Sequence, residues 1–259
     1  MPDFSRMIRR FDIWTDYGPI TTGSGASQPH YVATENGSEY LIKGASLTPA
    51  EPYVAANELV SALIANFLQL PILDFGLAED IRGNLFFASS YLSGGMFHPV
   101  LTEPLLDDCQ NRERVYNIVP FDIWLWNTDR HSGNFLIRDD RRGSRFLLLN
   151  DHSRCLVQPS ETPASLLTRA THGNISIFLG TPFVQDRITD PRLLSDGITA
   201  IEDIQDATIQ TLEHVIPDKL LDASEKQDVI QFLMERKLAL RSLIQAERHI
   251  FGRLGSGLI

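Results

Sequence analysis

The stretch Asn127-Thr128-Asp129-Arg130-His131-Ser132-Gly133-Asn134 carries only polar or small side chains. Largely apolar residues precede it at 121–126, and apolar residues follow it at 135–137. The sequence therefore predicts a polar turn that joins two buried elements. A second polar cluster, Asn150-Asp151-His152-Ser153, follows the apolar residues 146–149.

The segment between the two clusters is predicted to be a β-hairpin, with strands at 134–138 and 145–149 around Arg141-Arg142-Gly143-Ser144. Pairing that is symmetric about the Arg142–Gly143 bond sets Asn134 opposite Asp151, with Cα atoms about 5 Å apart. An amide oxygen and a carboxylate at that separation suit Mg²⁺, which takes few protein ligands and leaves room for phosphate oxygens. Asp129 would reach the same space and accept a proton from a hydroxyl group.

Each of these residues also has an ordinary interpretation. Taken singly, Asp129 and Asn134 are common turn residues, and Asp151 is a solvated strand end. Three such residues that converge through one hairpin, with His131 between two of them, favour a functional site instead.

The two clusters resemble the catalytic and metal-binding loops of atypical kinases, namely the HipA-like kinases and the phosphoinositide-kinase-related enzymes. The resemblance rests on Asp129-Arg130-His131-x-x-Asn134 and on Asp151-His152-Ser153. Ordinary protein kinases have the same order of a catalytic Asp, a metal-binding Asn five residues later and a metal-binding Asp downstream. The helical tail at 214–236 adds a weaker similarity, so that the resemblance spans about residues 23–244.

This resemblance implies an α+β, bilobal protein-kinase-like fold, with a small antiparallel-sheet lobe over residues 1–93 and a mainly helical lobe over 94–259. It implies Asp129 and His131 as catalytic residues, and Asn134 and Asp151 as the residues that bind Mg²⁺. The sequence departs from ordinary kinases at His152-Ser153, which stands where Phe-Gly is usual.

The N-terminal half carries the charged pair that a kinase small lobe needs. Residues 30–34 and 39–43 flank Asn36-Gly37, which predicts a hairpin whose second strand ends at Lys43. A helix is predicted from Thr48-Pro49 to about residue 69, and it contains Glu58 on a small, apolar face. Burying this carboxylate alone would be unfavourable, so Lys43 is its expected partner. The alternative is a surface lysine and a solvated glutamate.

Further ATP contacts follow from the resemblance. Backbone N–H groups of Gly23-Ser24-Gly25 would cover the β- and γ-phosphates, although position 28 is Gln28 and the third glycine of a G-x-G-x-x-G motif is missing. Ser90 and Leu92 would meet the adenine in a hinge near residues 88–95. The family also implies autophosphorylation near this glycine loop, at Thr21, Thr22, Ser24 or Ser27; the alternative is that these hydroxyls only cap turns.

The two histidines of the clusters have separate interpretations. His131 either packs in the catalytic loop or assists proton transfer, whereas His152 is expected to be a structural histidine bonded to a carbonyl group.

Other elements are predicted from local patterns. Strands are expected at 72–77 and 85–92, and a helix at 112–126 with a kink or end at Pro120. Ser224-Glu225-Lys226-Gln227 is interpreted as a capping box that opens a long amphipathic helix.

Composition excludes several classes of protein. Asp and Glu number 33 against 23 Lys and Arg, for a net charge of −10, which argues against a nucleic-acid footprint and against a lipid surface as partner. No stretch approaches 18 apolar residues, so no membrane span is expected. The two cysteines, Cys109 and Cys155, are too few for a disulfide framework, and a reducing cytoplasm fits best.

The expected activity is Mg²⁺/ATP-dependent phosphoryl transfer to a Ser/Thr hydroxyl of a protein substrate. One alternative is a pseudokinase or interaction module that binds nucleotide without transfer. Another is a phosphohydrolase with Asp129, His131, Asp151 and His152 around a transition metal; tightly retained Zn, Mn or Fe would favour it. An antitoxin-type partner is not inferred, because the chain is shorter than HipA toxins, which carry an additional N-terminal subdomain.

Overall fold

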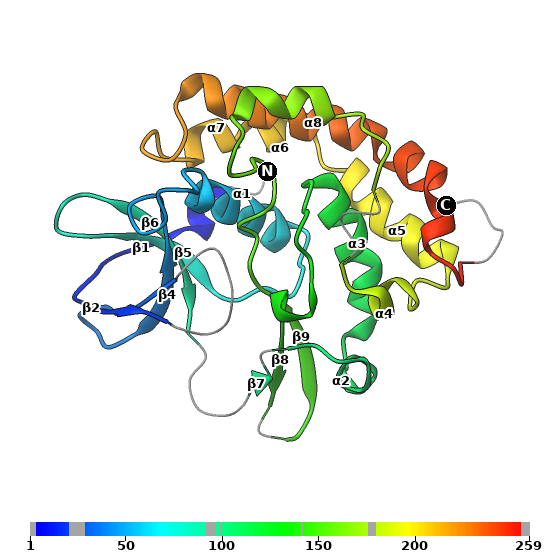
Figure 1. Cartoon of the computed structure of the whole chain (residues 1–259), viewed down its shortest axis with the longest axis horizontal. Coiled ribbons are helices and arrows are strands. Elements are labelled where there is room, and N and C mark those ends of the chain that lie inside the picture. Colours follow the sequence, from blue (N-terminus) through cyan, green and yellow to red (C-terminus); the bar gives the residue numbers. More distant parts are fainter. Residues whose placement is uncertain are drawn as a thin grey trace.

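The computed structural model describes residues 4–20, 29–91, 97–98, 100–140, 142–175 and 180–254. These residues form a part with a six-stranded sheet and a helical part with a smaller, three-stranded sheet. In Figure 1 the larger sheet lies at the left, and most helices gather at the top and right. The predicted combination of a small sheet lobe and a mainly helical lobe is confirmed. The predicted boundary between them, at residues 93 and 94, lies outside the described residues.

The six-stranded sheet has the order β1-β5-β6-β4-β3-β2. Its strands are β1 (Arg9–Asp12), β2 (Thr15–Pro19), β3 (His30–Ala33), β4 (Glu39–Lys43), β5 (Phe75–Glu79) and β6 (Leu85–Ser90). The hairpin of β3 and β4 is confirmed, and Gly37 in its turn has the positive φ of 78° that such a turn requires. The sheet is mixed rather than antiparallel as predicted, because β1 pairs in parallel with β5. Strand β5 begins later than residue 72 because Ile72 bridges Leu149 of the smaller sheet instead.

Helix α1 (Val54–Phe67) lies between the large sheet and the helical part, and almost all of its residues are buried. The prediction that it starts at Thr48-Pro49 was wrong, because residues 44–53 form turns. Pro52 has no N–H group and disfavours a helical conformation at the preceding Glu51. The predicted end near residue 69 was two residues too late, since Gln69 adopts a left-handed φ of 55°.

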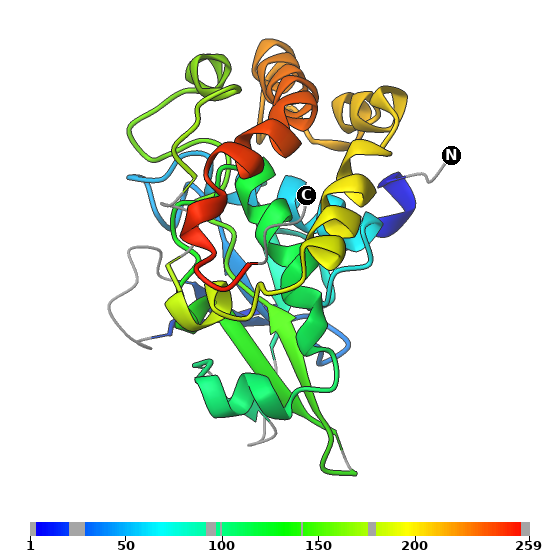
Figure 2. The same ribbon diagram turned by 90° about the vertical axis from the view of Figure 1, so that its right-hand side faces the viewer.

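The helical part surrounds helix α3 (Val115–Trp124), as the turned view in Figure 2 shows. Its other helices are α2 (Glu103–Asp108), α4 (Pro182–Gln185), α5 (Pro191–Glu202), α6 (Asp206–Gln210), α7 (Leu212–Val215) and α8 (Ala223–Ala246). Short 3-10 helices occur at Phe4–Met7, Arg112–Arg114, Ser132–Asn134, Pro163–Arg169 and Arg248–Ile250. The smaller sheet consists of β7 (Phe97–His98), β8 (Phe135–Asp139) and β9 (Arg145–Leu149).

Helix α3 does not end at Pro120, one of the two outcomes predicted there. Pro120 cannot donate a hydrogen bond to the carbonyl of Tyr116, one turn earlier. That carbonyl lies against Gly197 of α5, where a Cβ atom would come within 2.3 Å of the oxygen. The close crossing of α3 and α5 therefore shields the carbonyl that the proline leaves without a partner, and only glycine fits there.

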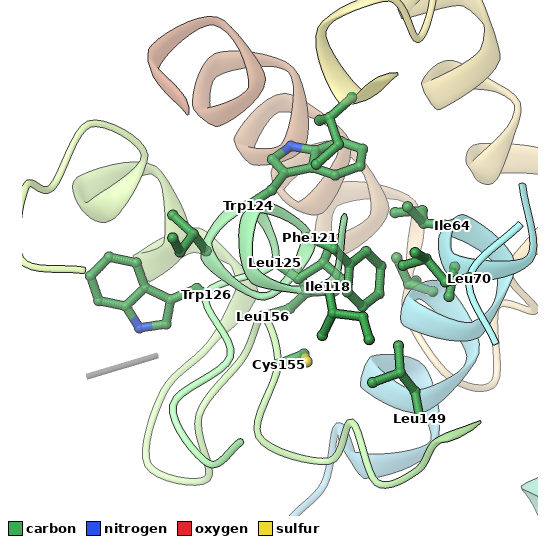
Figure 3. Close-up of a cluster of buried hydrophobic side chains, with 14 of the residues drawn as sticks. Ile64, Leu70, Ile118, Phe121, Trp124, Leu125, Trp126, Leu149, Cys155 and Leu156 are labelled. Carbon is green, nitrogen blue, oxygen red and sulfur yellow. The ribbon is translucent and has the colours of Figure 1, made fainter. Parts of the chain in front are cut away.

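The larger of two hydrophobic clusters joins the two parts of the molecule, and the smaller one lies on the six-stranded sheet. Figure 3 shows Ile64 from α1 beside Phe121 and Trp124 from α3, with Leu149 from β9 nearby. Trp124 is fully buried, and its indole Nε1 donates to the Leu233 carbonyl of α8 at 2.8 Å. Because α1 and α3 share this core, residues on the two parts are held at fixed positions relative to each other. Among the described residues, no helix is both long and apolar enough to cross a membrane.

The cap of α8 provides a first prediction. The sequence assigned the capping box to Ser224 and Gln227, but Asp222 and Glu225 form it: Asp222 Oδ1 accepts from the Glu225 N–H at 2.9 Å, and Glu225 Oε2 accepts from the Asp222 N–H at 2.8 Å. We expect Asp222→Ala to lower the free energy of unfolding measurably, because it removes the acceptor of the cap, and Ser224→Ala to lower it less. Urea denaturation of both variants checks this, and equal effects would contradict the observed cap.

Candidate active site

The centre of the candidate site is the ammonium group of Lys43, at the end of β4. Its Nζ lies 2.6 Å from Glu58 Oε1 of α1 and 2.8 Å from Asp151 Oδ1, just after β9. Burial by itself would lower the pKa of Lys43, but the two carboxylates outweigh burial and raise this pKa above its usual range. The predicted Lys43–Glu58 pair is therefore present, and Asp151 joins it from the other part of the molecule.

Asp151 is held at the exit of the β8–β9 hairpin in a left-handed conformation, with φ of 56°. Its Oδ1 accepts hydrogen bonds from the Ser153 N–H at 3.2 Å and from the Ser153 hydroxyl at 2.6 Å. Burial would raise the pKa of the Asp151 carboxyl, but Lys43 and the hydrogen bonds from Ser153 hold this pKa well below its usual range. Asp151 is therefore a carboxylate at neutral pH.

The predicted register of this hairpin was wrong by one residue. Phe135 pairs with Leu149, and the Asn150 N–H donates to the Asn134 carbonyl at 3.1 Å, so Asn134 lies opposite Asn150 rather than Asp151. The turn causes the shift: Asp140 N–H bonds the Ser144 carbonyl, and Gly143 with φ of 80° occupies the extra turn position. Asp151 is thereby freed from the strand ladder and can turn toward Lys43.

Asp129 and His131 lie together on the polar turn between α3 and β8. The Asp129 N–H donates to Asn127 Oδ1 at 3.0 Å, and about half of the Asp129 side chain is exposed. His131 Nδ1 accepts from the Gly133 N–H at 3.0 Å, while its Nε2 lies 3.9 Å from Asp129 Oδ2. A neutral ring that accepts at Nδ1 carries its proton on Nε2, so that proton faces the Asp129 carboxylate.

Asn134 is buried directly before β8, and its Nδ2 donates to the Asp129 carbonyl. This hydrogen bond from the Asn134 side chain to the Asp129 backbone carbonyl closes the turn from Asp129 to Asn134. Because Asn134 also pairs with Asn150 through the backbone, this turn and Asp151 are brought to the same end of the hairpin.

Sequence reasoning missed the residue that organises this turn, Arg130. Its guanidinium donates to both oxygens of Asp122 in α3, at 2.9 and 3.0 Å, and through NH1 to the carbonyls of Asn134 and Asn150, at 2.9 and 2.8 Å. Both members of the Arg130–Asp122 pair are at most 3% exposed. The available signal was Asp122, a lone carboxylate in an apolar helix, to which the argument used for Glu58 applies equally.

His152 is buried beside Glu58, which differs from the carbonyl partner that the sequence predicted for it. Its backbone N–H donates to Glu58 Oε2 at 3.0 Å, and its ring Nδ1 lies 3.6 Å from the same oxygen. The ring is 4% exposed and meets Phe121 edge-on. No group of three or more His, Cys, Asp or Glu side chains among the described residues is arranged to hold a metal ion. The buried, inward-facing His152 therefore does not support the phosphohydrolase.

The predicted nucleotide contacts are only partly described. Gly23, Ser24, Gly25 and Leu92 lie outside the described residues, as do Thr21, Thr22 and Ser27. Ser90 pairs with Tyr40, and side chains alternate along a strand, so Ser90 faces away from Phe87, the partner of Lys43. The Ser90 N–H is also already bonded to the Asp74 carbonyl. A small pocket beside Glu58 and Asp151 is lined instead by Phe87 and Ser89.

Comparison with solved structures identifies the fold as that of kinases. The proinflammatory kinase CtkA of Helicobacter pylori matches with a TM-score of 0.63 and 14% identity, over 92% of this chain and 97% of that chain. The Golgi casein kinase matches with a TM-score of 0.51 and 10% identity, over 93% of this chain and 75% of that chain. The predicted kinase-like fold is confirmed, whereas membership of the HipA-like family remains a prediction.

Sequence comparison does not assign the chain to a protein family. No protein-family model matches the chain, and no curated protein matches its sequence.

Proposed function

We propose that this protein is a Mg²⁺/ATP-dependent phosphotransferase that acts on a Ser/Thr hydroxyl group of a protein. The observation that carries the proposal is the contact of Lys43 with both Glu58 and Asp151. A lysine oriented by a buried carboxylate, beside a second carboxylate from the other lobe, is the arrangement that kinases use to hold ATP and Mg²⁺. The kinase-like fold supports the same assignment.

The atoms present fit both groups. Lys43, oriented by Glu58, supplies a permanent positive charge for phosphate oxygens, and Asp151 and Asn134 supply the carboxylate and amide oxygens that Mg²⁺ prefers. Asp151 Oδ1 already accepts from Lys43 and Ser153, so Oδ2 is its metal ligand in this proposal. When bound, ATP supplies the γ-phosphoryl group and Mg²⁺ neutralises charge on the phosphates.

In this proposal Asp129 contacts the substrate hydroxyl group that accepts the phosphoryl group. Its exposed carboxylate orients that hydroxyl group and accepts its proton as the oxygen forms the new bond to phosphorus. His131 directs its Nε2 proton toward Asp129 and so helps to hold the carboxylate in place. The rate enhancement comes from positioning and from charge stabilisation, without a covalent enzyme intermediate.

A protein is the proposed substrate rather than a lipid. The net charge of −10 repels an anionic membrane surface, and the sequence offers no basic amphipathic segment to offset that repulsion.

We expect the wild-type protein to transfer label from radiolabelled ATP to a protein in a cell lysate when Mg²⁺ is present, and not in EDTA. Asp151→Ala removes a metal ligand while Glu58 still pairs with Lys43, so transfer should fall to background although the protein remains folded. Gel autoradiography with circular dichroism of both proteins measures this.

The outcomes separate the alternatives. Undiminished transfer by Asp151→Ala would contradict the metal assignment. Mg²⁺-dependent binding of ATP by the wild type without transfer to any substrate would favour the pseudokinase.

A further inference from the structure

Asn57 in α1 is a buried amide whose side chain bonds only one segment of the described chain, residues 153–157. Its Nδ2 donates to the Ser153 carbonyl at 2.9 Å and to the Val157 carbonyl at 2.8 Å, and its Oδ1 accepts from the Val157 N–H at 3.3 Å. The side chain is 2% exposed. The amide N–H groups and the amide oxygen of the Asn57 side chain thus all bond a backbone segment that lies about 100 positions further along the chain.

The segment that Asn57 holds begins two residues after Asp151, and the backbone from Asp151 to Leu156 is unfavourable at two positions. Asp151 and Leu156 have φ values of 56° and 52°, in the left-handed region that residues with a Cβ atom disfavour. Such conformations persist only where surrounding contacts fix them. Asn57 bonds the segment on both sides of Leu156, at Val157 and at Ser153.

Two charged residues, in α1 and just before it, contact the same stretch of chain after Asp151. Glu58 Oε2 accepts from the His152 N–H at 3.0 Å, and Glu51, just before α1, lies 2.6 Å from Arg154 NH2. These contacts connect the helix that orients Lys43 to the loop that carries Asp151. Asn57 differs from Glu58 because it contacts neither Lys43 nor Asp151, and its hydrogen bonds all go to the backbone.

We propose that Asn57 is a positioning residue for Asp151: it holds residues 153–157 in the conformation that directs the Asp151 carboxylate to the metal. The inference rests on the proposed function. It predicts that loss of Asn57 weakens the binding of Mg²⁺ with nucleotide, while binding of nucleotide through Lys43 alone is preserved. Residues that orient a metal ligand typically change metal affinity by about 10- to 100-fold.

The test compares Asn57→Leu, which keeps the branched shape of the side chain but removes the hydrogen bonds, with Ser61→Ala. Ser61 lies one turn further along α1 and is fully buried, and among the described residues its hydroxyl makes no hydrogen bond to the segment. ATP binding is titrated with Mg²⁺ and, separately, measured in EDTA. We expect Asn57→Leu to need about tenfold more Mg²⁺ for half-maximal binding, with EDTA binding unchanged, and Ser61→Ala to match the wild type in both.

An unchanged Mg²⁺ requirement in Asn57→Leu would overturn the inference while leaving the proposed function intact. Absence of Mg²⁺-dependent ATP binding by the wild type would overturn the proposed function itself. If Asn57→Leu does not fold, Asn57→Asp replaces it, because this variant keeps the shape but turns an oxygen toward the two carbonyl groups.

A measurement on the wild type needs no variant. Since coupling between two sites is reciprocal, Mg²⁺ and ATP together should slow hydrogen exchange of the Val157 amide, which donates to Asn57. ATP in EDTA should not slow it. Equal exchange in both conditions would overturn the inference.

Discussion

Lys43→Met is expected to lower ATP turnover by about 10²- to 10³-fold, the usual effect of removing one preorganised charge-stabilising group. It is also expected to lower the free energy of unfolding by about 3 kcal/mol, because Glu58, which is 3% exposed, loses its lysine partner and keeps only the His152 ring within ion-pair distance among the described residues. Steady-state kinetics and urea denaturation measure the two effects.

The pH dependence of this stability difference follows from the two shifted groups. The pKa of the Asp151 carboxyl is depressed, so its contribution is present above its unfolded pKa and is lost only as pH falls through the folded value. The pKa of Lys43 is raised, so its contribution is present below its unfolded pKa and is lost only as pH rises through the folded value. In the wild type, the combined contribution of these two groups should therefore stay constant from about pH 5 to pH 9.

The double variant Lys43→Met/Glu58→Gln is the matched control. A neutral amide at position 58 removes the uncompensated buried charge, so stability should recover in part, whereas turnover should remain low because no cation binds the phosphates. Recovery of turnover in the double variant would show that Lys43 acts only through the fold.

The Lys43–Glu58 pair could be predicted because it depends on local patterns and on one general rule. An Asn-Gly turn set the hairpin that ends at Lys43, and a carboxylate on a small, apolar helix face needed a cation. The start of helix α1 was harder to predict. Thr48-Pro49 has the composition of a helix start, but Pro52 prevents the helix from beginning there, and Glu51 is used in an ion pair with Arg154.

The hairpin that joins the two polar clusters was predicted in type but not in register. Its register depends on whether the turn contains an even or an odd number of residues, and Asp140 and Gly143 select the odd form. Sequence symmetry about Arg142 and Gly143 does not distinguish the two. The convergence of Asp151 with Lys43 does not depend on this register, because Asp151 lies beyond the last strand pair and turns through its own left-handed φ.

Contacts between segments that are far apart in the sequence could not be predicted from it. Nothing near Asn57 indicates that it bonds the backbone at Ser153 and Val157, because backbone carbonyls leave no residue-specific signal in a sequence. The Arg130–Asp122 pair was also missed, but it did leave a signal in the sequence: a carboxylate in an apolar helix needs a cationic partner, which Arg130 provides.

The largest loss of stability is expected for Arg130→Met. Asp122 is 2% exposed and would remain a buried carboxylate whose only described partner is the Asn127 amide, at 2.8 Å. Breaking one side of a buried ion pair costs about 3–5 kcal/mol, and the carbonyls of Asn134 and Asn150 lose their guanidinium donor as well. We expect a correspondingly lower free energy of unfolding and no detectable phosphoryl transfer, because Asp129 and Asn134 lie on the turn that Arg130 holds.

Arg145→Met is the matched control, because Arg145 forms ion pairs with Asp108 and Asp139 but is 34% exposed. The same substitution there should cost less than about 1 kcal/mol. The double variant Arg130→Met/Asp122→Leu distinguishes the effect of the uncompensated Asp122 charge from the effect of losing the Arg130 hydrogen bonds. Replacing both members of a buried pair with apolar residues should restore much of the stability. Transfer should nevertheless stay low, since neither of the two introduced apolar side chains can donate to the Asn134 and Asn150 carbonyls. Equal destabilisation by Arg130→Met and Arg145→Met would show that the Arg130–Asp122 pair does not organise the site.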